Sequence, residues 1–530
     1  MKKIKNIKGA KFALSMLALL SISTSCRKDM NGLNQDLKLL PQPLLAIDGK
    51  EASILLPGMM TNIESAVNYI YQGQQDLGQD EYAGYTAVPS VFVGNVNNFT
   101  YSFVDDWVNY CWDVPQQNIL NTWLQWKLKK YDTKYPDLYG IALICKVFGA
   151  SRAADTFGPI PYSKFGSSAN VQFDTVEEAY NAFFTDLDQA IALLSAIEDK
   201  EPDADQLRFK AFDNSTFNGD YSKWIKTANT LKLRLAIRIS NIAPAKAKTE
   251  AESAVSNKYG VLESADGGFL MKVSGQNPID EIVTSWGDMR LGAPVSSILG
   301  GLKDPRLAKM GLPAEDPALG GQIKGIRTGI PLVVGVYSKF SKLATSFSAP
   351  LKIVDVAESY FLRSEGVVRG WNMGGGSAQT FYENGVKTSF SEYGAGGVDT
   401  YLADATSTPA AYVDPKNHDN DAPALSNITV KWNDGDSMDK KMERIITQKW
   451  IAVFPEGYEG WAEFRRTGYP KQYPVRNNDS KGKIANGDFV KRMPYSSSFT
   501  NSSKAQVDAA VSKEFGGDDS PGKRLWWDVN

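Results

Sequence analysis

The chain has 530 residues, of which 42% are hydrophobic and 22% charged, and its formal net charge is −2 at neutral pH. These proportions are ordinary for a globular protein, and the length allows a large buried core. A nearly neutral chain without a basic run argues against nucleic acid as a partner. The single histidine, His418, excludes a histidine-rich metal site and any mechanism that needs two imidazoles.

The first 25 residues have the pattern of a signal peptide. Lysines precede the apolar run Phe12–Ile22, which is too short to span a bilayer as a helix, and small residues follow it. Small residues directly before a cysteine resemble a lipoprotein processing site, so we predict that Cys26 is lipidated. Ser23 stands where such sites usually carry an aliphatic residue, and the alternative is an ordinary secretory signal. Residues 26–50 are polar and contain two prolines, as expected of a tether.

Helical periodicity governs much of the remaining chain. The clearest helix is predicted from Thr175 to Leu194, where Thr175 and Glu178 can form a capping box. Other helices are predicted at 54–70, 117–131, 137–155, 221–242, 244–259, 354–370 and 377–393. Paired amphipathic helices joined by short turns indicate a scaffold like that of tetratricopeptide repeats, although no strict 34-residue repeat is visible.

Three segments lose this periodicity, at 71–116, 260–350 and 394–437. The first of them mixes flat aromatic side chains with amides, glycines and carboxylates. Aromatic faces can cover the C–H patches of a sugar while amides and carboxylates bond its hydroxyls, although packed loops can have the same composition.

The stretch 448–470 predicts a helix hairpin. Aromatic residues recur at three- and four-residue spacing, and Gly457 and Gly460 are expected to make the turn. Two pairs are spaced to meet on one helix face, Trp461 with Arg465 by stacking and Glu463 with Arg466 by ion pairing. We interpret this stretch as a buried aromatic–arginine core and not as a ligand site.

The same stretch, from Ile445 to Pro470, resembles the late signature of the SusD/RagB family, and in particular its SusD-like branch. Further motifs that resemble the family are Asp155–Tyr162, Leu302–Leu307, Ala357–Trp371, Tyr382–Val386 and Arg524–Asp528. The resemblance therefore covers nearly the whole mature chain.

The resemblance implies a mostly α fold: a tetratricopeptide-like helix-pair scaffold with a loop-rich second lobe containing few short strands. We expect one SusD-like domain over 51–530. Its scaffold would lie mainly at 117–260 and 353–393, and its irregular lobe mainly at 71–116, 260–350 and 394–437.

The resemblance also implies the function. Members of this family are surface lipoproteins of Bacteroidetes-type bacteria that capture nutrients for a SusC-like TonB-dependent transporter. We therefore expect a lipid-anchored protein on the outer membrane at the cell surface, which binds a glycan or oligosaccharide and performs no chemical step. The alternatives are a member that binds peptide or another nutrient, and a surface glycoside hydrolase.

No motif for hydrolytic, nucleotide or metal chemistry is present in the sequence. A glycoside hydrolase needs two carboxylates that face one sugar ring, and the adjacent Asp105 and Asp106 cannot both do so on a regular element. The acidic loops at 414–421 and 434–439 lack the spacing of an EF-hand, so a solvated loop is favoured over a structural calcium and no cofactor is expected. Cys111 and Cys145 lie among apolar residues and are predicted to be buried thiols.

The ligand is expected on loops outside the repeat helices, as the resemblance implies. From 71–116, the predicted stacking platforms are Tyr82, Tyr85, Trp107 and Trp112, and the predicted polar contacts are Asn97, Asn98 and Asp106. From the second irregular segment we add Trp286 for stacking, with Asp288 and Arg290 for hydroxyl recognition. Some of these aromatic residues are expected to pack the loops themselves.

Overall fold

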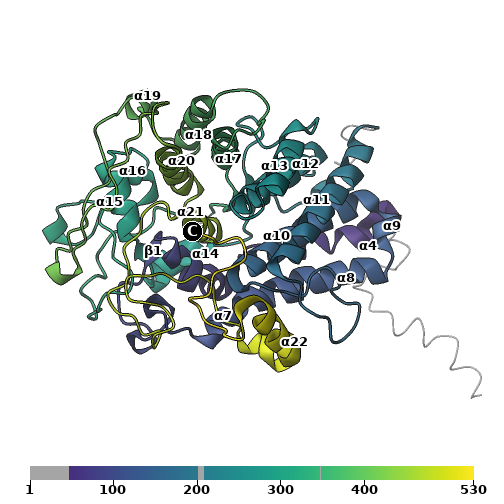
Figure 1. Cartoon of the computed structure of the whole chain (residues 1–530), viewed down its shortest axis with the longest axis horizontal. Helices are drawn as coiled ribbons and strands as arrows, with labels where there is room; N and C mark the ends of the chain where they lie inside the picture. The colour runs from purple at the N-terminus through teal and green to yellow at the C-terminus, as the bar shows by residue number, and fades with distance from the viewer. Residues whose placement is uncertain (1–46, 201–207, 347) are drawn as a thin grey trace, which may run out of the picture. The chain divides into compact units, whose positions relative to one another are not determined.

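The computed structural model describes residues 47–200, 208–346 and 348–530 (Figure 1). The predicted signal peptide, Cys26 and most of the predicted tether lie outside the described residues. The chain divides into a unit that ends at Glu51 and a unit from Ala52 to Asn530, and the architecture below is that of the second unit. None of the described helices combines the length and the apolar character needed to cross a membrane.

Long helices pack in succession to form the scaffold. The first group, with each helix packed on the next, is α10 (Pro136–Phe157), α11 (Val176–Glu198), α12 (Tyr221–Arg238) and α13 (Pro244–Ser256). The second group, which contacts α12 through its first helix, is α17 (Val356–Val368), α18 (Ala378–Glu392) and α20 (Met438–Val453). The two groups lie side by side in the upper half of Figure 1. The predicted tetratricopeptide-like helix-pair scaffold is confirmed.

Helix α11 shows why these sequences form helices here. The Thr175 side chain accepts from the Glu178 backbone N–H, and the Glu178 carboxylate accepts from the Thr175 N–H at 2.8 Å, which completes the predicted capping box. The buried side chains of α11 are those of the predicted stripe, from Val176 to Leu194. Since the opposite face is polar and exposed, burial of this stripe against α10 and α12 holds the helix in place.

The first irregular segment is more helical than its sequence indicates. It contains the π-helix η2 (Gln72–Asp80) and the helix α7 (Asp105–Val114), which pack on each other. Apolar periodicity misses η2 because the side chains that it buries are largely polar, Gln74, Gln75 and Asp76 among them. The predicted helix at 54–70 is instead interrupted, and it forms only α5 (Leu56–Met60) and α6 (Asn68–Tyr71).

Two short antiparallel strand pairs join the irregular segments. Strand β1 (Thr86–Ala87) pairs with β3 (Arg290–Leu291), and β2 (Phe269–Met271) pairs with β4 (Leu351–Val354), with a register shift after Phe269. The first pair matters most for function, because it brings the two segments predicted to bind ligand side by side.

The predicted helix hairpin is formed by α20 and α21 (Gly457–Thr467), but its glycines have another role. The turn is made by 454–456, and both Gly457 and Gly460 lie inside α21. A Cβ at Gly457 would lie 2.1 Å from a carboxylate oxygen of Asp80, and one at Gly460 would lie 2.8 Å from the ring of Tyr85. These glycines therefore allow the segment 80–85 to approach α21, and the expectation that they make the turn was wrong. Gly468, with φ of 75°, ends α21 as predicted.

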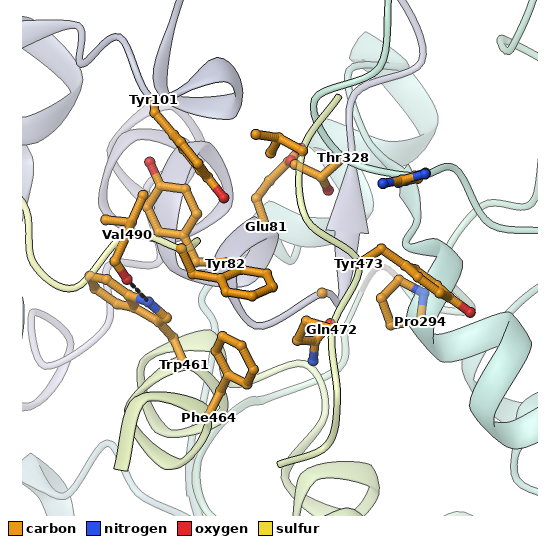
Figure 2. Close-up of a pocket in the computed structure, with 14 residues that line it drawn as sticks. Glu81, Tyr82, Tyr101, Pro294, Thr328, Trp461, Phe464, Gln472, Tyr473 and Val490 are labelled. Atoms are coloured by element: carbon orange, nitrogen blue, oxygen red, sulfur yellow. Dashed lines mark hydrogen bonds between the residues drawn. The ribbon is translucent and has the colours of Figure 1, made fainter. Parts of the chain in front are cut away.

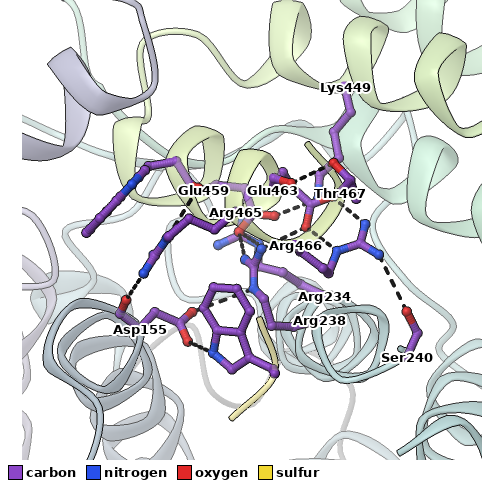
Figure 3. Close-up of polar contacts among 12 residues, drawn as sticks. Asp155, Arg234, Arg238, Ser240, Lys449, Glu459, Glu463, Arg465, Arg466 and Thr467 are labelled. Carbon is purple, nitrogen blue, oxygen red and sulfur yellow. Dashed lines mark hydrogen bonds and ion pairs between the residues drawn. The ribbon is translucent and has the colours of Figure 1, made fainter. Parts of the chain in front are cut away.

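Helix α21 also carries a buried ionic core (Figure 3). The Arg465 guanidinium lies 3.6 Å from the centre of the Trp461 ring system, and Arg466 pairs with Glu463 at 2.6 Å, so both predicted pairs are confirmed. Burial alone would raise the pKa of Glu459, but Arg238, Lys449 and Arg234 around it hold that pKa well below its usual range. Because these cations come from α12 and α20, the network ties α21 to both groups of scaffold helices.

The remaining helices are short or peripheral. Those before the scaffold are η1 (Ile47–Gly49), α4 (Lys50–Ser53), η3 (Val93–Asn95), η4 (Asn98–Thr100), the π-helix η5 (Pro115–Leu120), α8 (Asn121–Leu128) and α9 (Tyr131–Lys134). Those after it begins are η7 (Lys210–Phe212), α14 (Pro278–Asp280), the π-helix η8 (Glu281–Trp286), α15 (Ala293–Gly301), α16 (Leu307–Met310), η9 (Pro317–Leu319), α19 (Val398–Leu402), η10 (His418–Asn420) and α22 (Ser497–Phe515).

Candidate ligand-binding surface

Two of the predicted stacking platforms lie in the protein core. Tyr85 has no exposed surface, its ring stacks on that of Trp450 at 4.9 Å, and its hydroxyl donates to the Trp450 carbonyl at 2.6 Å. Trp112 is also buried and stacks on Phe499 at 4.4 Å. Neither ring offers a face to solvent in this structure.

A second group of predicted residues holds the loop 88–97. The Tyr82 hydroxyl donates to the carbonyl of Asn98 at 2.9 Å, and the Asn97 amide donates to the carbonyl of Phe92 at 2.6 Å. The half-buried Trp107 packs on Phe92, with ring centroids 5.5 Å apart. The Asn98 amide donates to the carbonyl of Leu77, and its oxygen accepts from the backbone of Val104. The contacts of these side chains within the protein define the shape of the loop.

Arg290 and Asp106 differ in their surroundings. Arg290 is buried on β3, and its guanidinium donates to the carbonyls of Ser338, Gly287 and Met289. These bonds fix the turn that follows η8. Asp106 is exposed in the first turn of α7.

Trp286 and Asp288 lie on the surface, where they meet residues of the first irregular segment. Among the large hydrophobic side chains that the described residues expose, the aromatic ones are Trp286, 38% exposed, and Tyr69, 55% exposed. The amide of Gln72 donates to the carboxylate of Asp288 at 2.9 Å and so links η2 to the residues after η8. Tyr110 stands edge-on to Tyr69, with centroids 6.3 Å apart. We name Tyr69, Gln72, Tyr110, Trp286 and Asp288 the aromatic face.

Local backbone geometry positions these side chains. Trp286 is the last residue of η8, and Gly287 follows in the left-handed region with φ of 74°, which a side chain would disfavour. This turn brings Asp288 back so that its N–H donates to the Ile282 carbonyl. On the other side, a Cβ at position 73 would lie 2.3 Å from the Tyr110 ring, so Gly73 allows the ring to lie against η2.

The aromatic face has the chemistry that a sugar requires. Exposed rings of Trp and Tyr can cover C–H patches, while the amide and carboxylate between them can donate to and accept from hydroxyls. Sequence reasoning missed Tyr69, Gln72 and Tyr110. Tyr69 was assigned to a continuous helix, although its polar neighbours Asn68 and Gln72 signal an exposed face.

A separate enclosed cavity lies on the opposite flank of η2 (Figure 2). Tyr82, Tyr101, Trp461 and Phe464 surround it, and the Trp461 indole donates to the Val490 carbonyl at 3.3 Å. Its volume is about 30 Å³, room for about two water molecules and too little for a sugar ring. Burial raises the pKa of Glu81 in its wall well above the usual range, although the nearby Thr328 hydroxyl lowers it.

Two larger cavities, of about 400 and 560 Å³, share Lys352 and Tyr393 in their walls. The Lys352 ammonium donates to Asp355, to the Tyr393 hydroxyl and to the Ala452 carbonyl. All three of its protons are therefore engaged within the protein.

The acidic loop at 414–421 is organised by its own hydrogen bonds. The buried Asp414 carboxylate accepts from the Tyr337 hydroxyl, the Asn420 amide and the Lys416 backbone. Asp421 accepts from the backbone of Asp414 and contacts His418. Over the described ranges, no three histidine, cysteine, aspartate or glutamate side chains are grouped as a metal ion would require. Cys111 and Cys145 are buried free thiols, as predicted.

A family model described as "SusD-like: Susd and RagB outer membrane lipoprotein" matches residues 32–528. The chain belongs to the SusD-like family. It is accordingly an outer-membrane lipoprotein, as the sequence predicted, while the lipidation of Cys26 itself stays a prediction.

Solved structures of SusD homologues are similar over nearly their full length. A chitin-binding SusD homologue from Flavobacterium johnsoniae is 41% identical with a TM-score of 0.86, and the alignment covers 91% of this chain and 99% of that one. A SusD homologue from Bacteroides uniformis is 37% identical with a TM-score of 0.84, with 90% and 99% covered. One from Bacteroides vulgatus is 34% identical with a TM-score of 0.85, with 91% and 99% covered. None of the curated proteins matches the chain.

Proposed function

We propose that this SusD-like protein binds an oligosaccharide at the cell surface through its aromatic face and delivers it to a SusC-like TonB-dependent transporter. The observation that carries the proposal is the exposure of Trp286 and Tyr69 on either side of the Gln72–Asp288 hydrogen bond. A soluble protein rarely exposes grouped aromatic rings beside oriented polar side chains unless they meet a ligand.

The preferred ligand class is a chitin-type oligosaccharide. This choice is supported by the homologue from Flavobacterium johnsoniae, which is described as chitin-binding and is 41% identical over its full length. An N-acetylated sugar offers apolar C–H and methyl groups for the rings of Trp286 and Tyr69. Its amide N–H is a donor that the Asp288 carboxylate can accept.

Binding without hydrolysis is favoured by the positions of the carboxylates. Asp288 is the carboxylate of the aromatic face, and its partner across the face is the neutral amide of Gln72. The close carboxylate pair of Asp76 and Asp80 in η2 is buried, and burial raises the pKa of both. Because no sugar reaches that pair in this structure, it does not supply the acid and nucleophile of a glycosidase.

The test is titration of the purified mature protein with chitin-type oligosaccharides, maltooligosaccharides and short peptides by calorimetry. We expect the chitin type to bind, and Trp286→Ala or Tyr69→Ala to weaken it by about 1–3 kcal/mol each, as expected for loss of a stacking platform. Tyr259→Ala, which removes a tyrosine near the end of α13, is the matched control and should bind as the parent does. Equal affinity in the parent and both aromatic variants would place the site elsewhere.

The two alternatives have their own readouts. Binding of peptides without any glycan would support a different nutrient class on the same fold. Release of reducing ends during incubation with the oligosaccharide would indicate hydrolysis. Delivery is tested by copurification with a tagged SusC-like barrel, when one is encoded beside this gene.

A further inference from the structure

Two loops of the irregular lobe display valine side chains to solvent. The first loop, 88–97, exposes Val91, Val93 and Val96, and the second, 329–336, exposes Val333 and Val334. Their exposed fractions lie between 39% and 76%, the last being that of Val334. We name these residues the valine patch. Single exposed valines are common, but apolar side chains gathered on neighbouring loops mark an interaction surface.

The two loops start from one shared base. Ala87, Ile330 and Tyr337 belong to a small core cluster of their own, against which Leu332 packs. The Thr328 hydroxyl contacts the carbonyl of Thr86 at 3.5 Å. A Cβ at Gly329 would lie 2.8 Å from the carbonyl oxygen of Phe99, so the second loop starts directly against the segment that follows the first.

The first loop holds its valines outward at a conformational cost. Val93 has φ of 44°, a left-handed conformation that is rare for a β-branched residue. Phe92 packs inward on Trp107, and its carbonyl accepts from the Asn97 amide at 2.6 Å. Because Phe92 points inward, its neighbours on both sides face solvent. The surrounding hydrogen bonds therefore enforce the exposure of Val93.

Charge is absent from both loops. The sequence has no charged residue from Val88 to Val104, nor from Thr328 to Ser338. A surface for anionic lipid would need lysine or arginine, and a sugar platform would need exposed rings. An apolar surface without charge instead matches the centre of a protein–protein interface, where charged residues are depleted.

We infer that the valine patch is the surface through which this lipoprotein docks on its transporter barrel, against an apolar and uncharged region of that protein. The inference rests on the proposed function for the identity of the partner, and it assigns the contact to residues outside the aromatic face. Both proteins are held in one membrane, so the effective concentration of each for the other is high and a small apolar patch suffices.

The experiment uses the full lipidated chain, coexpressed with the affinity-tagged SusC-like barrel encoded beside its gene. The amount of chain retained per barrel is measured after detergent extraction. We expect Val333→Asn with Val334→Asn to lower retention at least ten-fold, and Val93→Gly to lower it about two- to five-fold. Val93→Gly has a second signature, because glycine relieves the left-handed strain and the melting temperature should equal or exceed that of the parent.

Two controls separate the explanations. Val529→Asn changes a valine that is 50% exposed near the C-terminus and should leave retention unchanged. Trp286→Ala should lose glycan binding and keep retention.

Failure of the parent to copurify with the barrel would overturn the proposed delivery, and the inference with it. Retention of the parent together with equal retention of all valine variants would overturn the inference alone. Loss of self-association in the variants, with retention on the barrel intact, would assign the patch to a second copy of this chain and also overturn it.

Discussion

Replacement of Trp461 by alanine tests whether the aromatic–arginine core serves folding or ligand binding. The indole is 1% exposed, lies 5.2 Å from the ring of Tyr82 and stacks on Arg465. Truncation of a buried Trp costs about 3–5 kcal/mol of the free energy of unfolding. Loss of the indole also removes the hydrogen bond to the Val490 carbonyl and a face of the Arg465 guanidinium, so the upper part of that range is expected.

The expected change in melting temperature follows from the size of the unit. About 480 residues from Ala52 to Asn530 unfold with an entropy of about 1 kcal/mol/K if they unfold together. A loss of 4–5 kcal/mol would therefore lower the melting temperature by about 4–5 °C. The assay is differential scanning calorimetry, paired with titration of the oligosaccharide below the transition. Trp461→Ala should melt earlier and bind as the parent does, whereas Trp286→Ala should do the reverse. An unchanged melting temperature with lost binding in Trp461→Ala would refute the structural role.

Three further predictions concern other parts of the chain. Burial raises the pKa of Glu64 to about 8 from 4.5, so its stabilising contribution is complete below pH 4.5 and is lost as the pH rises through 8. The stability difference between the parent and Glu64→Gln should then change by up to about 1.4 kcal/mol per pH unit between pH 5 and 8, measured by denaturant titration. Gly460→Ala should destabilise the protein by about 1–3 kcal/mol because of the contact with Tyr85, while Gly396→Ala, which meets no atom within 4 Å, should be neutral in thermal melting. Cys26→Ala should release the protein from the membrane fraction, and unchanged fractionation with unchanged acyl labelling would contradict lipidation.

The local elements of the scaffold were predictable because their signals are local. The capping box of Thr175 and Glu178 and the apolar stripe of α11 involve residues within a few turns of one another. The pairing of Trp461 with Arg465 likewise needs only a helix and a spacing of four. The N-terminal pattern and the separated family motifs also stand in the sequence, and they led to the family before any contact was known.

The aromatic face was predictable only in part, because exposure is decided by partners far along the chain. The composition of 71–116 marks Tyr85 and Trp112 as readily as Tyr69 and Tyr110. Tyr85 is in the core because Trp450, distant in sequence, covers its ring and accepts from its hydroxyl.

The sequence by itself determined the helix stripes, the helix caps, the pairs within single helices and the family, since each depends on spacing along one segment. The tertiary structure decided that β1 pairs with β3 and that Gln72 meets Asp288. It also decided that Gly460 serves close packing instead of a turn. The physical reason is that burial and cross-chain hydrogen bonds depend on which distant segments fill the remaining space, and no local period records that choice.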